Sequence, residues 1–265
     1  MTRRLKRFYV SSSLEARDNR HQSGKEATVL LTQEETHYLK RVLRMKRGDR
    51  CLLFDRRGSE FLSCLDRVDP SGRCAVKLLR PMTRTRRERF TLSVAQSVPQ
   101  HRKMDEIVRK AAELGVFELI PMVTDRTVVR MSKEREVQVD QRWDRLVAQT
   151  LQQSRIETFP QIRPMTSFQT LCAELEKFDQ VFLFHPSPEA RPIRDLLRPQ
   201  AEGECGDEHR SVRILLLIGP EGGFTDREIK ASQACGAKLV RMSTGIMKSD
   251  TAFVAATSLI RCMYE

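Results

Sequence analysis

The sequence lacks the features that would place it in a membrane, outside the cell or around a metal ion. No apolar run approaches the length of a membrane-spanning helix. The basic segment Met1–Arg7 has no apolar stretch behind it, as a secretion signal would. The seven cysteines include no CxxC pair, and no histidine accompanies them at zinc-ligand spacing. We therefore expect reduced thiols in a cytoplasmic protein that binds neither metal nor membrane.

Two common nucleotide-binding motifs are also missing. No GK[ST] completes a P-loop, and no GxGxxG motif follows an early strand. Glycine is scarce, with 12 in 265 residues, yet three glycines fall within Gly219–Gly223. The apolar run Ile214–Ile218 before them indicates a buried strand, and Thr225 with Glu228 forms a capping-box pattern. The segment therefore predicts a strand, a glycine turn and a helix start, a combination that brings backbone close to a ligand.

The excess of positive over negative charge is confined to the first third of the chain. Residues 1–90 contain 23 lysines and arginines against 11 aspartates and glutamates, whereas residues 91–265 contain 24 of each. The net charge of +12 therefore belongs to the N-terminal part. Because the basic residues continue through predicted strands and a helix, we expect a module that binds a polyanion, and nucleic acid is favoured over a merely solvated surface.

Turn signals and apolar spacing divide the chain into two domains and a linker. Residues 1–80 show short strand patterns with turns at Gly48, Gly58 and Gly72, which is typical of a small β-barrel. The basic segment 81–89 has no apolar periodicity and is predicted to be a linker. In residues 90–265 strands alternate with helices, which predicts an α/β domain with a parallel sheet. Two of its helices are expected over Asp140–Ser154 and Asp250–Met263, the second capped by Ser249.

A helix predicted over Thr32–Arg44 arranges part of the basic charge on one side. Its basic face contains residues at i, i+4 and i+7 and extends beyond the helix: His37, Arg41, Arg44 and Lys46. Its apolar face would dock on the barrel: Leu39, Val42 and Leu43. We predict that the basic face contacts RNA phosphates, with a solvated basic face as the alternative.

Two further turns follow strands of the second domain. Phe184–Pro186 follows a strand predicted over Gln180–Phe184, and Met242–Met247 follows a strand predicted over Lys238–Met242. In a parallel sheet, turns at the carboxyl ends of strands meet at one edge, where ligands bind. Together with the glycine turn they predict a pocket that is lined mainly by backbone.

Three segments, in this order along the chain, are similar to motifs of one family: His37–Asp49, Lys103–Val116 and Leu217–Phe224. Through them the chain resembles, over nearly its whole length, the RsmE family, the SPOUT-class methyltransferases that act on uridine N3 in small-subunit ribosomal RNA. The resemblance implies an N-terminal PUA-like barrel that binds RNA. It also implies a C-terminal α/β domain with a deep trefoil knot, which is a rare exception to unknotted topology. Members of the family are homodimers that share the active site across the interface.

The resemblance further implies that S-adenosylmethionine binds within the knot. The three turns would line its pocket: Phe184, His185, Pro186, Ile218, Gly219, Pro220, Glu221, Gly222, Gly223, Met242, Ser243, Thr244, Gly245, Ile246 and Met247.

The chain departs from the family pattern near the expected substrate side. Gly245 and Lys248 replace two arginines, Asp250 replaces a glutamate, and Arg155 stands one residue before the position where an arginine is expected. Lysine cannot make the planar two-pronged contact of arginine. We expect Asp250 to accept the uracil proton or to orient the base. Lys248 and Arg155 would offset negative charge on the uracil oxygens.

The resulting prediction is methylation of uridine N3 in small-subunit ribosomal RNA with S-adenosylmethionine as methyl donor. Because N3 is hidden in a Watson–Crick pair, the target base must be unpaired or extruded. Two alternatives stay open at this point. One is a knotted methyltransferase for another ribosomal or transfer RNA site, and the other is a non-catalytic RNA-binding assembly factor.

Overall fold

The computed structural model describes residues 5–14, 27–82, 89–99, 103–128, 133–154, 156, 158–195, 211–242 and 245–264, with backbone only for 133–140. The chain divides into two compact units. The first comprises Met1–Arg86 and Ala148–Phe159, and the second comprises Arg87–Val147 and Pro160–Glu265. The boundary therefore falls inside helix α4 (Lys133–Gln153).

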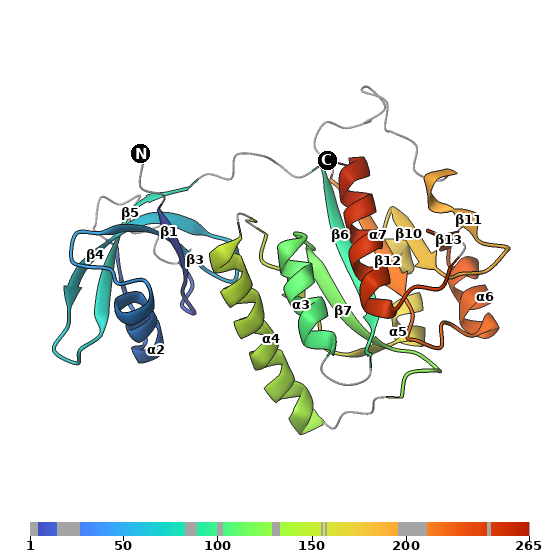
Figure 1. Ribbon diagram of the computed structural model, residues 1–265, viewed down its shortest axis with the longest axis horizontal. Helices are drawn as coiled ribbons and strands as arrows, with labels where there is room; N and C mark the ends of the chain where they lie inside the picture. The colour runs from blue at the N-terminus through green and yellow to red at the C-terminus, as the bar shows by residue number, and fades with distance from the viewer. Residues whose placement is uncertain are drawn as a thin grey trace. The chain divides into compact units, whose positions relative to one another are not determined.

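The first unit is built on a five-stranded sheet in the order β1-β3-β4-β5-β2. The β1–β3 pair is parallel and the other pairs are antiparallel. Alternate side chains meet in one core that includes Phe8, Val29, Leu53 and Val76, as expected of a small barrel. The strands are β1 (Lys6–Tyr9), β2 (Thr28–Leu30), β3 (Arg50–Phe54), β4 (Glu60–Val68) and β5 (Cys74–Pro81) (Figure 1).

The predicted turns of this unit are confirmed. Gly48, Gly58 and Gly72 have φ angles of 89°, 77° and 81°. These left-handed conformations favour glycine because any Cβ would crowd the following carbonyl. Most of the basic segment predicted as a linker, 81–89, lies outside the described residues, and Pro81 is the last residue of β5.

Helix α2 (Gln33–His37) begins at the predicted N-cap. The Thr32 hydroxyl accepts a hydrogen bond from the Glu35 amide, and the Glu35 carboxylate accepts one of 2.8 Å from the Thr32 amide. The capping box therefore fixes the start of the helix that was expected from the sequence.

The α-helix does not continue to Arg44 as expected, because a π-helical turn, η1 (Tyr38–Val42), follows it. The amide of Leu43 donates to the carbonyl of Tyr38 at 3.0 Å, five residues back. This wider turn packs Tyr38 and Leu43 against the core and leaves Val42 58% exposed. The prediction that Val42 faces the barrel was therefore wrong.

The second unit contains a parallel sheet in the order β11-β13-β10-β12-β6-β7-β8, with β9 paired to β7. The predicted α/β architecture is confirmed. The described strands are β6 (Phe90–Ser97), β7 (Glu118–Val123), β8 (Gln161–Ile162), β9 (Thr166–Ser167), β10 (Gln180–Phe184), β11 (Arg191–Pro192), β12 (Val212–Ile218) and β13 (Lys238–Arg241).

Helices cover both faces of this sheet. One face, with Leu215 and Leu217 of β12, packs against α5, η2 and α6. Ile214, Leu216 and Ile218 of the same strand are also buried, and α7 lies against β6 and β12 with α3 beside it (Figure 1). The elements are α3 (Lys103–Glu113), α5 (Phe168–Cys172), η2 (Leu175–Lys177), η3 (Ile193–Asp195), α6 (Asp226–Ala234) and α7 (Ser249–Tyr264).

Helix α4 begins at Lys133, seven positions before the predicted Asp140. Its contact with α3 is anchored at Asp105, which is 9% exposed. Trp143 donates from Nε1 to the Asp105 carboxylate at 3.2 Å, and Arg142 pairs with the same carboxylate. A buried indole and a charged partner thus satisfy the oxygens of a carboxylate that would otherwise be costly to bury.

Candidate functional site

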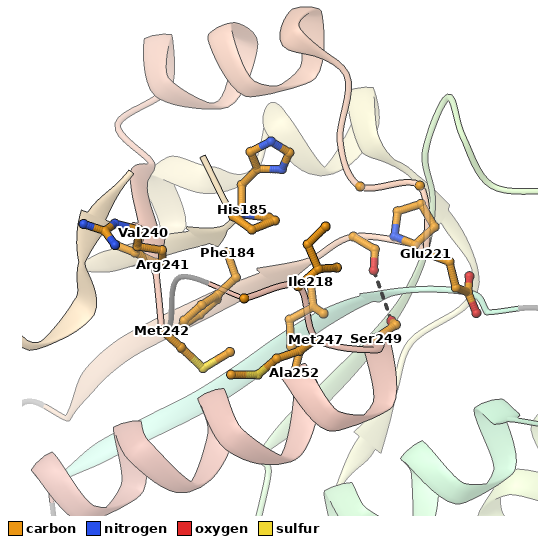
Figure 2. A pocket seen from close by; sticks show the side chains of 17 residues that line it. Phe184, His185, Ile218, Glu221, Val240, Arg241, Met242, Met247, Ser249 and Ala252 are labelled. Carbon is orange, nitrogen blue, oxygen red and sulfur yellow. Dashed lines mark hydrogen bonds between the residues drawn. The ribbon is translucent and has the colours of Figure 1, made fainter. Parts of the chain in front are cut away.

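Three turns enclose a cavity of about 280 Å³ at the carboxyl ends of β10, β12 and β13 (Figure 2). The strands bring the turns together because Phe184 pairs with both Ile218 and Val240 across the sheet. The cavity volume is near the lower end of the range for small-molecule sites, about 300–1,000 Å³. The lining contains these residues predicted from the sequence: Phe184, His185, Pro186, Ile218, Gly219, Pro220, Glu221, Gly222, Gly223, Met242, Gly245, Ile246 and Met247.

Sequence reasoning missed four residues of the lining: Val240, Arg241, Ser249 and Ala252. Three of them flank the turn Met242–Met247 in the strand before it and the helix after it. Ala252 lies one helical turn beyond Ser249, so helix periodicity would have found it. The other two predicted members, Ser243 and Thr244, lie outside the described residues.

The glycine turn (Gly219–Gly223) is tightly folded. Gly223 has a φ of 69°, and its amide donates to the Pro220 carbonyl at 2.8 Å. After it, Thr225 caps α6 and forms the predicted capping box with Glu228. Glu228 is only 2% exposed and also accepts a 2.9 Å bond from the Asp125 amide. Its buried carboxylate is thus held by several donors, as burial of a charge requires.

Ser249 joins the glycine turn to the strand beside it. Its hydroxyl donates to the Gly219 carbonyl at 3.1 Å and accepts from the side-chain amide of Gln96 at 2.6 Å. Ser249 is the first residue of α7, and its side chain is engaged in these two bonds. The prediction that Ser249 caps α7 was therefore wrong.

His185 carries a polar atom without a partner. Its Nδ1 is buried and has no hydrogen-bond partner within the described part of the chain. Burial lowers the pKa of His185 below its ordinary 6.5, nearby Arg126 lowers it further, and Asp226 opposes the shift. The imidazole is therefore neutral at physiological pH and can give or take a hydrogen bond from a ligand.

Two of the catalytic candidates, Lys248 and Asp250, lie next to residues of the cavity lining in the chain but are not part of that lining. Asp250 is in the first turn of α7, where its carboxylate accepts a 3.0 Å bond from the Thr251 amide. Lys248 is exposed just before that helix. The third candidate, Arg155, lies outside the described residues. In the glycine turn, Glu221 pairs with Lys103 at 3.4 Å, and both side chains are partly exposed.

The RNA-binding candidates His37, Arg41, Arg44 and Lys46 are all exposed on the first unit. Arg44 has a φ of 50°, a conformation that is uncommon outside glycine. The following turn is held by Asp49, whose carboxylate accepts a 2.8 Å bond from the Lys46 amide. The π-helical turn and this left-handed residue thus replace the continuous basic helical face that was predicted.

Within the described ranges, no helix is long and apolar enough to cross a membrane. The same residues contain no group of three histidine, cysteine, aspartate or glutamate side chains placed to hold a metal ion.

Two family models match the chain. An RNA methyltransferase domain matches residues 86–261, which is more than half of the chain, and the PUA domain of RNA methyltransferases matches residues 31–72. The chain is similar to ribosomal RNA small subunit methyltransferase E of Synechocystis sp., with 27% identity over 91% of this chain and 75% of the relative. The same enzyme of Bacillus subtilis is 24% identical over 90% of this chain and 91% of the relative.

Solved structures share the whole fold. A Legionella pneumophila methyltransferase in complex with S-adenosylmethionine has a TM-score of 0.80 at 23% identity, covering 98% of both chains. Ribosomal RNA small subunit methyltransferase E of Neisseria gonorrhoeae, bound to S-adenosylmethionine, has a TM-score of 0.76 at 23% identity, also covering 98% of both chains.

Fold and family models together define an RNA methyltransferase with a PUA-like N-terminal unit and a parallel-sheet catalytic unit. Within that class the chain belongs to the RsmE family of SPOUT-class methyltransferases, as the resemblance predicted. The deep trefoil knot in the second unit stays a prediction.

Proposed function

We propose that this chain transfers a methyl group from S-adenosylmethionine to N3 of a uridine in small-subunit ribosomal RNA. The observation that carries the proposal is the cavity, in which three turns distant in sequence converge at one edge of the parallel sheet. The names of the relatives support ribosomal RNA of the small subunit as the substrate. The choice of uridine N3 rests on the three motifs that resemble the RsmE family.

The lining fits S-adenosylmethionine. Backbone of the glycine turn supplies hydrogen-bond groups, and the buried Nδ1 of His185 has no hydrogen-bond partner among the residues that the structure describes. Met242 and Met247 extend their side chains on the opposite side of the cavity from His185 (Figure 2). Such a site, mainly apolar with a few fixed polar groups, suits a small cofactor with an apolar body and polar ends.

Bound S-adenosylmethionine supplies a methyl group that is made electrophilic by the positive sulfur. The protein must then expose the N3 lone pair of uracil and hold it in line with that methyl group. We assign to Asp250 the removal of the N3 proton or the orientation of the base. Lys248 and Arg155 are assigned to the negative charge that develops on the uracil oxygens. Lys248 and Asp250 directly follow the turn that lines the cavity, which supports this assignment.

We further propose that residues 1–80 form the RNA-binding barrel, that 81–89 link it, and that 90–265 form the methyltransferase domain. Exposed His37, Arg41, Arg44 and Lys46 would contact phosphates of the RNA. The positive balance of the first 90 residues supports this division of labour.

The proposed working form is a cytoplasmic homodimer. Helix α7 supports the dimer, because a row of small or apolar side chains remains at least partly exposed along it: Thr251, Val254, Ala255, Ser258 and Cys262. Such a face is expected to be covered by another chain. Light scattering during gel filtration tests it, and a monomer mass at micromolar concentration would contradict the dimer.

Two experiments test the function. Calorimetry should show one S-adenosylmethionine site per chain, and its absence would contradict the cofactor. Modified bases should then be mapped in ribosomal RNA from cells that lack the protein. Loss of one N3-methyluridine in small-subunit RNA, restored by the purified protein, is the expected result. A full set of N3-methyluridines in the deleted strain would overturn the proposed target.

A further inference from the structure

The loop that follows β7, Thr124–Thr127 (the β7 loop), contributes no residue to the lining of the cavity. It is held by its own hydroxyl groups and by that of Ser97, the last residue of the neighbouring strand β6. The Thr127 hydroxyl lies 2.9 Å from the hydroxyls of Ser97 and Thr124, and it accepts a 2.9 Å bond from the Thr124 amide. The loop is therefore a rigid support, since its short polar groups satisfy one another.

Arg126 extends from this support to the glycine turn. Its guanidinium donates to the Gly222 carbonyl at 2.6 Å and to the Phe224 carbonyl at 3.4 Å. A second connection runs beside it, where the Asp125 amide donates to the buried Glu228 carboxylate at 2.9 Å. The turn and the helix cap that follows it are thus both bonded to the β7 loop.

The glycine turn packs closely on Arg126 at Gly222, which has no side chain. A Cβ at Gly222 would lie 3.3 Å from Cδ of Arg126, which is tighter than an ordinary contact. A Cβ at Gly223 would lie 3.4 Å from Cε1 of His185. The turn is therefore packed between Arg126, which is not in the cavity lining, and His185, which is.

We propose that Arg126 is the positioning residue of the cofactor turn, holding Gly222–Phe224 in the conformation that receives S-adenosylmethionine. The ligand in this statement rests on the proposed function, whereas the holding of the turn does not. Arginine suits the task because one guanidinium nitrogen, Nη1, carries two N–H groups that can reach the two carbonyls. Carbonyls that accept from a charged donor also form stronger bonds than neutral pairs do. Arg126 acts through the turn and is assigned no contact with the cofactor.

The test compares Arg126→Met, Arg126→Lys and the control Arg109→Met. Arg109 lies on α3 and forms an ion pair with Glu106 on its own helix. Calorimetry with S-adenosylmethionine should show affinity about tenfold weaker in Arg126→Met, because charge-assisted bonds to the turn are lost. Arg126→Lys keeps the charge and one donor group and should lose less, and Arg109→Met should bind as the wild type does. Wild-type affinity in Arg126→Met would overturn the proposal.

A second readout separates this proposal from the proposed function. The Gly223 amide is bonded to Pro220 in the turn, so its hydrogen exchange in the free protein reports whether the turn is held. Exchange should be faster in Arg126→Met than in the wild type and unchanged in Arg109→Met. Unchanged exchange in Arg126→Met would overturn the positioning role even if the wild type binds the cofactor. A wild type that binds no S-adenosylmethionine would instead contradict the proposed function, with the exchange result still deciding the role of Arg126.

Discussion

The hydroxyl of Ser249 donates a 3.1 Å hydrogen bond to the carbonyl of Gly219, which ties the first residue of α7 to the first residue of the glycine turn (Figure 2). The same hydroxyl accepts from Gln96, a fully buried residue of β6. One side chain therefore connects three elements around the proposed cofactor cavity.

Ser249→Ala should lower both stability and cofactor affinity. The substitution removes the bond to Gly219 and deprives the buried Gln96 amide of a partner. We expect the free energy of unfolding to fall by about 1–2 kcal/mol and the affinity for S-adenosylmethionine to fall several-fold. Urea unfolding and calorimetry measure the two effects.

Thr257→Val is the matched control on the same helix. The Thr257 hydroxyl is fully buried and has no partner in the part of the chain that the structure describes. Replacing it by a methyl group of similar size should leave stability equal or slightly higher, because no hydrogen bond is lost. An equal loss in both variants would attribute the Ser249 effect to helix packing and contradict the role of its hydroxyl.

Asp250→Asn and Lys248→Met should reduce methyl transfer more than cofactor binding. Neither side chain lines the cavity, so the calorimetric affinity for S-adenosylmethionine should change less than about twofold. If either group acts on the uracil in the transition state, its replacement should lower kcat by about a hundredfold. Single-turnover methylation of RNA with saturating cofactor measures the chemical step. Unchanged kcat in both variants would remove them from the mechanism.

The features that local chemistry determines could be predicted from the sequence. Thr225 and Glu228 are three residues apart, so a capping box was visible without the fold, and the structure confirms it. The glycine turn and the strand ends around it followed from apolar runs broken by small residues. A parallel sheet then brings such strand ends to one edge, so the convergence of Phe184, Ile218 and Met242 was predictable in outline.

Features that depend on tertiary contacts could not be predicted in this way. Serine is a residue type that often caps helices, so Ser249 was predicted to cap α7. Its hydroxyl instead donates to the Gly219 carbonyl and accepts from the Gln96 side-chain amide, both distant in sequence. The π-helical turn at Tyr38–Val42 changes which side chains of the basic segment share a face, and no local sequence pattern predicted this turn. The role of Arg126 requires knowing that Gly222, 96 residues away, lies beside it.

Replacing Arg41, Arg44 and Lys46 by glutamine should weaken RNA binding and reduce its salt dependence. All three are exposed on the basic unit. If each contacts one phosphate, the slope of log affinity against log salt should fall by about 2 in magnitude, at roughly 0.7 per contact for single strands. Fluorescence anisotropy over a salt series measures it. The control is Arg67→Gln, because the Arg67 side chain is 69% exposed on β4 beside Asp66. An unchanged slope in the triple variant would show that Arg41, Arg44 and Lys46 are solvated surface residues and do not contact RNA.

His185 should make stability fall in mild acid. Burial and the charge of Arg126 hold its pKa in the folded protein below 6.5, while Asp226 opposes them. Below about pH 6.5 the unfolded chain therefore binds a proton that the folded chain does not, so the free energy of unfolding decreases as pH falls and gains nothing further above that range. Urea titrations from about pH 5 to about pH 8 should show this slope in the wild type and a shallower one in His185→Gln. The control is His37→Gln, which replaces an exposed histidine of the other unit. Equal changes of slope in the two variants would show that the pH dependence does not come from His185.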